Sequence, residues 1–194
     1  MAEIATVFPM PSPVGHLIAG AAIAWAVEAL PSRRPKTAEP ASRPPRLPLV
    51  TPLVVACSAL ALAPDVDILM AAHRTYTHSA GSVILLACVA GVVARALRGP
   101  AVLTALACAA AVGSHIVLDW LGHDGTAPIG VMALWPFTAA YLYSGVDLFA
   151  DVSRRYWKPD EFILGNAWSI ARELLILLPP AGLAWLARRR RQYR

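Results

Sequence analysis

Apolar runs alternate with short polar segments along most of the chain. Separate runs cover residues 14–30, 47–63, 80–97 and 170–187, and another begins at residue 101 and continues into a polar cluster after residue 112. Each run approaches the roughly 17 to 25 residues that an α-helix needs to cross the hydrocarbon core of a bilayer. The pattern predicts an all-α fold, a polytopic membrane helical bundle of about five transmembrane helices. Residues 1–194 are expected to form a single domain.

The composition agrees with a membrane setting. Hydrophobic residues make up 57% of the chain, charged residues 15%, and the mean hydropathy is +0.55, well beyond an ordinary soluble domain. We therefore predict a multi-pass protein of the bacterial cytoplasmic (inner) membrane, in contact with the lipid bilayer. The net charge is +5, but the basic residues flank the apolar runs in short clusters, as topology signals do. We expect no nucleic-acid partner.

The basic residues also predict which side each segment faces. The segment at residues 31–46 is rich in proline and holds five basic residues, so it is expected to be a flexible cytoplasmic loop. The chain then starts outside, and the successive runs bring every histidine to the outer side: His16, His73, His78, His115 and His123. The histidines were not used to assign the topology, so their convergence indicates one site at the outer membrane face.

Residues 129–169 allow two topologies. The stretch 129–150 is apolar enough to span the membrane, but it contains Pro136, Gly145 and Asp147. If it spans, the terminal residues Arg188–Arg191 lie outside; if it is interfacial or re-entrant, they lie inside. We favour the interfacial or re-entrant alternative because it puts most of the 17 basic residues on the cytoplasmic side.

Candidate metal ligands cluster at the ends of the apolar runs. His115 and Asp119 are four residues apart in a predicted helix, which places both side chains on one face. Asp65 and Asp67 cannot share a helix face, but on a turn after Pro64 both carboxylates can point inward. The full set of predicted metal ligands is His16, Asp65, Asp67, His73, His78, His115 and Asp119. The alternatives are a buried hydrogen-bonded pair for His115 and Asp119, and helix capping for the two aspartates.

The types of donor group indicate the metal and the chemistry. Histidine with carboxylate suits Zn²⁺, with Mn²⁺ or Fe²⁺ as alternatives, and the candidates exceed the four ligands of one tetrahedral zinc, so one to three ions are expected. The three cysteines lie singly within apolar runs and indicate neither a disulfide framework nor a thiolate zinc site. Divalent metals lower the pKa of a bound water to about 7. The sequence therefore predicts a metal-dependent hydrolase.

Three residues are predicted to be catalytic. Asp65 or Asp67 would orient the metal-bound water, and Arg74 offers a planar donor fork for phosphate oxygens. The predicted substrate is a phosphoester in a lipid or lipid-linked molecule, since the ligands lie at headgroup depth. The sequence has no His-Glu-x-x-His run, which argues against a zinc peptidase. The alternative is a non-enzymatic protein that binds or carries a metal ion or a proton, but the predicted spans hold few polar groups in their centres, mainly Ser58 and Thr104.

Five motifs between residues 12 and 140 resemble those of the YdjM-like membrane-bound metal-dependent hydrolases. In order they are Pro13-Val14-Gly15-His16, Ala63-Pro64-Asp65-Val66-Asp67, His73-Arg74-Thr75-Tyr76-Thr77-His78-Ser79, Gly113-Ser114-His115 through Leu118-Asp119, and Leu134-Trp135-Pro136-Phe137. The resemblance implies a helical membrane protein whose hydrolase site is related in arrangement to the zinc-dependent phospholipase C group. Thr75 and Tyr76 stand where the family usually has a small residue, which implies a narrower site. The stretch after Phe137 matches less clearly.

Overall fold

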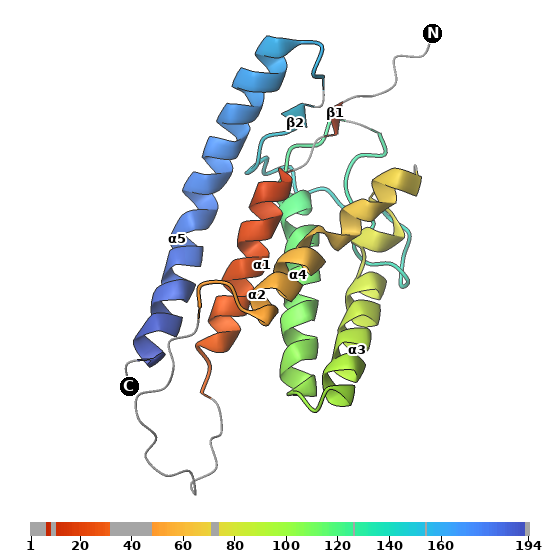
Figure 1. Ribbon diagram of the computed structural model, residues 1–194. Coiled ribbons are helices and arrows are strands. Elements are labelled where there is room, and N and C mark those ends of the chain that lie inside the picture. The colour runs from red at the N-terminus through yellow and green to blue at the C-terminus, as the bar shows by residue number, and fades with distance from the viewer. Residues whose placement is uncertain are drawn as a thin grey trace, which may run out of the picture.

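The computed structural model describes residues 7–8, 11–31, 48–70, 74–125, 127–153 and 155–192. These residues are mainly helical, with one antiparallel pair of short strands (Figure 1). In chain order the elements are β1 (Val7–Phe8), α1 (Pro13–Glu28), α2 (Pro52–Leu62), the 3₁₀ helices η1 (Ala63–Met70) and η2 (Tyr76–His78), α3 (Ala80–Ala96), α4 (Ala101–Leu121), β2 (Val152–Ser153), the π-helical turn η3 (Glu161–Gly165) and α5 (Asn166–Gln192). The predicted all-α class is confirmed. The predicted basic loop at 31–46 lies, beyond residue 31, outside the described residues.

Hydroxyl side chains begin three of the helices. Ser12, Thr51 and Ser79 are the N-caps of α1, α2 and α3, and each side-chain oxygen accepts a hydrogen bond from the backbone N–H three residues later. A proline follows each cap of α1 and α2, where the missing N–H would have had no partner in the helix. The caps of α1 and α3 therefore fix chain segments that carry His16 and His78.

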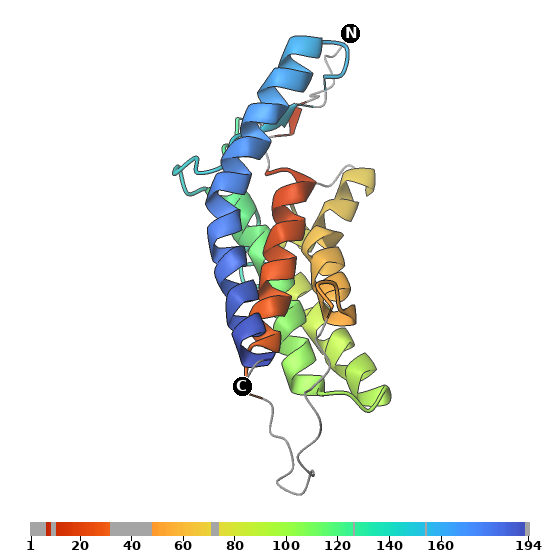
Figure 2. The same cartoon turned by 60° about the vertical axis from the view of Figure 1, so that its left-hand side comes forward.

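Helix α1 packs against α2, α4 and α5, while α3 packs along α4 (Figures 1 and 2). The core between α1, α2 and α4 is built from small and medium side chains: Ala24, Val54, Cys57, Ala107 and Ala111. Gly20 allows α1 and α2 to approach closely, because a Cβ at this position would lie 2.6 Å from the carbonyl oxygen of Cys57. Small residues bring helix backbones together in this way within membrane bundles.

Two of the described helices are long and apolar enough to cross a membrane: α4, and the continuous helix at Phe162–Gln192. Helices α1 and α3 are apolar but have 16 and 17 residues. Helix α2 has 11 residues, a length of about 16 Å, against a hydrocarbon thickness of about 30 Å. The helical bundle is thus observed, and the count of five membrane spans stays a prediction.

Residues 129–150 form no helix in the structure. Their backbone instead bonds to the ends of other elements: Met132 N–H donates to the Arg74 carbonyl, and Leu148 N–H donates to the Leu121 carbonyl at the end of α4. An irregular backbone does not cross lipid, because its polar groups would be unpaired. A transmembrane helix at 129–150 is therefore excluded, and the interfacial location of this region stays a prediction.

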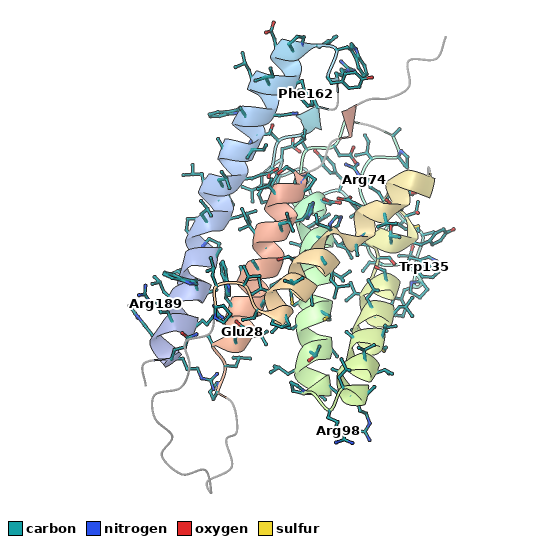
Figure 3. All side chains as sticks on the ribbon, viewed as in Figure 1. Glu28, Arg74, Arg98, Trp135, Phe162 and Arg189 are labelled. Atoms are coloured by element: carbon teal, nitrogen blue, oxygen red, sulfur yellow. The ribbon has the colours of Figure 1, made fainter. Side chains whose placement is uncertain are left out.

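The last turns of α5 are bonded to both sides of the predicted basic loop. Arg188 Nε lies 2.6 Å from Glu28 Oε2 near the end of α1, and its Nη2 donates to the carbonyl of Pro48, just before α2. Figure 3 shows Arg189, Glu28 and Arg98 toward one end of the bundle and Arg74 toward the other. The terminal arginines and the ends of the basic loop therefore lie together, as the favoured topology requires.

Candidate metal centre

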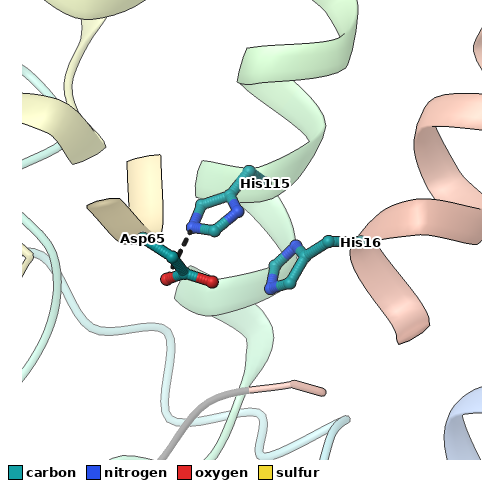
Figure 4. Close-up of side chains that lie close together, drawn as sticks. All are labelled: His16, Asp65 and His115. Carbon is teal, nitrogen blue, oxygen red and sulfur yellow. Dashed lines mark ion pairs between the residues drawn. The ribbon is translucent and has the colours of Figure 1, made fainter. Parts of the chain in front are cut away.

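Four chain segments bring ionisable side chains to one point inside the bundle. His16 comes from α1, Asp65 from η1, His78 from η2, and His115 and Asp119 from α4. The three histidines are fully buried and Asp119 is nearly so, whereas the side chain of Asp65 is 18% exposed. Figure 4 shows His16, Asp65 and His115 facing one another from three separate elements. The centre is therefore closed except on the side of Asp65.

Three of these ligand atoms, from His78, His115 and Asp119, have the spacing of a metal site, and an oxygen of Asp65 lies close to two of them. Nε2 of His78 lies 3.0 Å from Nε2 of His115 and 3.2 Å from Oδ2 of Asp119, and the latter two atoms are 3.3 Å apart. Oδ1 of Asp65 lies 3.5 Å from the His115 nitrogen and 3.7 Å from the His78 nitrogen. Zinc bonds of about 2.0–2.1 Å require ligand atoms about 3.3–3.4 Å apart in a tetrahedron. The observed separations bracket that value.

His16 adds a third imidazole to the cluster. Its Nε2 lies 3.4 Å from Oδ1 of Asp119, the carboxylate oxygen that does not face His78 and His115. The His16 ring also stacks on His115, with centroids 3.9 Å apart, and His16, Asp65 and His115 form a second group with ligand distances. Asp119 thus has one carboxylate oxygen beside His16 and the other beside His78 and His115.

Several buried atoms of the cluster lack a hydrogen-bond partner among the described residues. They are both ring nitrogens of His16, both carboxylate oxygens of Asp119 and Oδ1 of Asp65. An unsatisfied buried polar group costs about 1–3 kcal/mol, and more when it is charged. Bound cations would satisfy one nitrogen of His16, both oxygens of Asp119 and Oδ1 of Asp65, so the residues present fit a divalent metal.

Groups behind two of the histidines turn the correct nitrogen toward the centre. Nδ1 of His115 lies 2.7 Å from the Ala61 carbonyl, which only accepts, so Nδ1 carries the proton and the Nε2 lone pair faces the cluster. Nδ1 of His78 lies 3.1 Å from Oδ2 of Asp67. The same Asp67 oxygen accepts from the Arg74 N–H and the Thr77 hydroxyl. Asp67, predicted from sequence as a ligand, therefore lies behind His78 and contacts its outer nitrogen.

The electrostatics of the cluster favour cations. Burial by itself would lower the pKa of His78, but its hydrogen bonds to the carboxylates of Asp119, Asp65 and Asp67 outweigh burial and raise the pKa well above its ordinary value. The carboxylates around His78 therefore favour positive charge at this position.

The other predicted residues have different surroundings. Arg74 has a positive φ of 65°, is buried, and pairs through Nη1 with Asp124, which also accepts from the Gly130 N–H. Its predicted role as a phosphate-binding residue stays a prediction. His123 is exposed and pairs with Asp147 instead of joining the cluster. His73 lies outside the described residues.

Glu173 also belongs to this region, although the sequence predicted no role for it. It lies on α5, is fully buried, and accepts hydrogen bonds from the backbone N–H and the hydroxyl of Ser12, the N-cap of α1. A Cβ on Gly15 would lie 2.9 Å from its Oε2. Glu173 thereby fixes the first turn of the helix that carries His16. The sequence feature that could have indicated a role for Glu173 is its position as an acidic residue within an apolar helix, since such residues are usually functional.

These features define a helical membrane protein with a buried histidine–aspartate centre. The chain matches the family model of the YdjM inner membrane protein over residues 10–190 and belongs to that family. The match continues well past residue 137, beyond the motifs recognised in the sequence. No curated protein and no solved structure matches the chain.

Proposed function

We propose that this protein is a metal-dependent hydrolase of the inner membrane that cleaves a phosphoester in a lipid or lipid-linked substrate. The observation that supports the proposal best is the convergence of His78, His115 and Asp119, whose ligand atoms lie 3.0–3.3 Å apart, with an oxygen of Asp65 3.5–3.7 Å from the two histidine nitrogens. Ionisable groups buried among apolar helices are costly and are usually functional. The membrane family match is consistent with this setting.

Zinc is the metal that suits this donor set best. His78, His115 and Asp119 would hold one ion, with Asp65 as a further oxygen donor beside the two histidines, and His16 with the other oxygen of Asp119 would contribute to a second. When bound, zinc supplies a water with a pKa near 7 and polarises the scissile bond. Manganese and iron remain the alternatives, because imidazole and carboxylate accept them as well.

The side chains around the centre suggest separate roles. Asp65 is the partly exposed ligand, so water and substrate would enter on its side, and its carboxylate is the candidate to orient the attacking water. Asp67 instead holds His78 in place through Nδ1. The backbone N–H of Arg74 donates to Asp67 and so links Arg74 to the centre. To hold a phosphate oxygen, the Arg74 guanidinium would have to bind it while also contacting Asp124.

A carrier function has less support. A carrier needs polar groups that continue from the centre through the membrane. The bundle on the other side of His115 is instead apolar, with a core of Ala24, Val54, Cys57, Ala107 and Ala111. The hydroxyls of Ser58 and Ser114 are both bonded to carbonyls within the bundle. The described residues therefore provide no polar path, and hydrolysis is the better proposal.

The location of the centre on the outer membrane face is part of the proposal. Arg189 lies toward the end of the bundle away from Arg74 (Figure 3), and basic residues favour the cytoplasmic side. Reporter fusions after Ala41 and after Arg194 should both read cytoplasmic, and a fusion after Thr75 should read external. An external reading after Ala41 would invert the topology and move the centre to the cytoplasmic face.

The activity is tested with the detergent-purified, zinc-loaded protein. Phospholipids, polyprenyl-type lipid phosphates, a generic phosphodiester and a peptide panel are incubated with the wild type, His115→Ala and His123→Ala. His123→Ala is the matched control because it removes an exposed histidine outside the cluster. We expect zinc-dependent phosphoester cleavage by the wild type and the control, and none by His115→Ala. Cleavage of peptides alone would assign the protein to the peptidases.

A further inference from the structure

A groove between α3 and α4 ends in two arginines, at the end of the bundle opposite the metal centre. The wider part encloses about 830 Å³ and is lined by Arg95, Arg98, Pro100, Val102 and Leu106, among others. It joins a second hollow of about 390 Å³, lined mainly by small apolar residues of both helices, including Ala87, Cys88, Gly91 and Ala105. The two hollows share Arg95, Ala101 and Val102. Together they form an apolar trough with a cationic end.

The cationic end has no counter-charge within the described residues. Arg95 and Arg98 are both exposed, and neither forms an ion pair with a described carboxylate. They are also the only Lys, Arg, Asp or Glu between Ser79 and Asp119. The first turn of α4 borders the same hollow, and its N-cap, Pro100, provides no side-chain hydrogen bond. Free N–H groups and the helix dipole there favour an anion as well.

The apolar part is a shallow, open surface of almost wholly apolar character. Helices α3 and α4 approach closely at Gly91, where a Cβ would lie 3.2 Å from the Cβ of Ala105. The small side chains on either side leave the trough open along α3 from Arg95 back to Ala87. A molecule that fits both parts has an anionic head and an acyl chain.

We propose that this groove binds an anionic phospholipid of the cytoplasmic leaflet, with its phosphate on Arg95 and Arg98 and one acyl chain against Gly91 and Ala105. Basic pockets between transmembrane helices on the cytoplasmic side recognise anionic headgroups. Arg98 lies toward the same end of the bundle as Arg189 (Figure 3), the end predicted to face the cytoplasm. The proposal does not depend on the hydrolase function, because the groove and the metal centre share no residue.

Cys88 is a natural probe of this groove. It is exposed and lines the apolar part, whereas Cys57 and Cys108 are buried. The full-length protein in detergent is treated with N-ethylmaleimide while phosphatidylglycerol or phosphatidylcholine with identical acyl chains is titrated in, and modification of Cys88 is followed by mass spectrometry. We expect phosphatidylglycerol to protect Cys88 at lower concentration, with roughly a fivefold preference from each arginine.

Three variants locate the effect. Arg95→Gln with Arg98→Gln should remove the preference for phosphatidylglycerol, and Val102→Trp should weaken protection by filling the groove while both arginines stay. Arg189→Gln is the matched control, since Arg189 lies toward the same end but over Trp185, and it should keep the preference. Equal protection by the two lipids would overturn the proposal. So would an unchanged preference in the double variant, or its loss in Arg189→Gln.

Discussion

Asp67 gives the sharpest test of how the centre is built, because the sequence and the structure assign it different roles. One oxygen of Asp67 accepts from the Arg74 N–H at 3.1 Å and from the Thr77 hydroxyl, and it contacts Nδ1 of His78 at 3.1 Å. The carboxylate is therefore a positioning group, which holds the His78 ring so that Nε2 faces the other ligands. The informative change is Asp67→Asn.

Asn keeps an oxygen for the three donors but removes the negative charge that supports His78. Loss of such a supporting carboxylate typically lowers metal affinity by about 10- to 100-fold, or about 1.4–2.7 kcal/mol. Asp67→Ala is a poorer test, because it leaves buried donors unpaired at about 1–3 kcal/mol and so also affects folding. We expect Asp67→Asn to remain folded and to bind zinc in this weakened range.

The measurement is a zinc competition titration against a fluorescent chelator in detergent. His115→Ala provides the value for loss of a direct ligand, and His123→Ala provides the control for loss of a histidine outside the cluster. Wild-type affinity in Asp67→Asn would show that Asp67 does not support the centre. Loss of zinc as complete as in His115→Ala would show that Asp67 binds the metal directly, as the sequence predicted.

Three further predictions follow from the contacts described above. Zinc at about 100 times its dissociation constant should stabilise the fold by about 2.7 kcal/mol, so a chelator should lower the Tm of the wild type and leave that of His115→Ala unchanged. Burial would lower the pKa of His78, but the nearby carboxylates raise it. Protons therefore compete with zinc for this imidazole, and calorimetry in different buffers should show zinc binding that weakens as the pH falls. Glu28→Ala leaves Arg188, which is 3% exposed, without its carboxylate, and denaturation should show a loss of about 3–5 kcal/mol.

Local patterns in the sequence predicted most of the helices and the approach of His115 to Asp119. His115 and Asp119 meet because residues four apart on an α-helix lie on the same face, one turn apart. Their ligand atoms are 3.3 Å apart in the structure. The start of α3 is equally local, because the Ser79 hydroxyl accepts a hydrogen bond from the N–H three residues later. These features need no knowledge of how the helices pack.

The roles of Asp67 and Glu173 could not be predicted in the same way. Asp65 and Asp67 lie on a 3₁₀ helix, in which residues three apart share a face. Because these two residues are only two apart, their carboxylates point in different directions. One reaches the ligand atoms and the other reaches the back of His78. Glu173 bonds to Ser12 across 161 residues of sequence, and the packing of α5 on α1 decides that contact.

The most direct test of the metal centre is the metal content of the detergent-purified protein, measured by elemental analysis after growth with zinc. The wild type and His123→Ala should carry zinc in stoichiometric amount, and His115→Ala and Asp119→Ala should lose it while still inserting into the membrane. A wild-type protein that binds no metal even after reconstitution, or full zinc occupancy in both ligand variants, would contradict the assignment of this cluster as a metal centre.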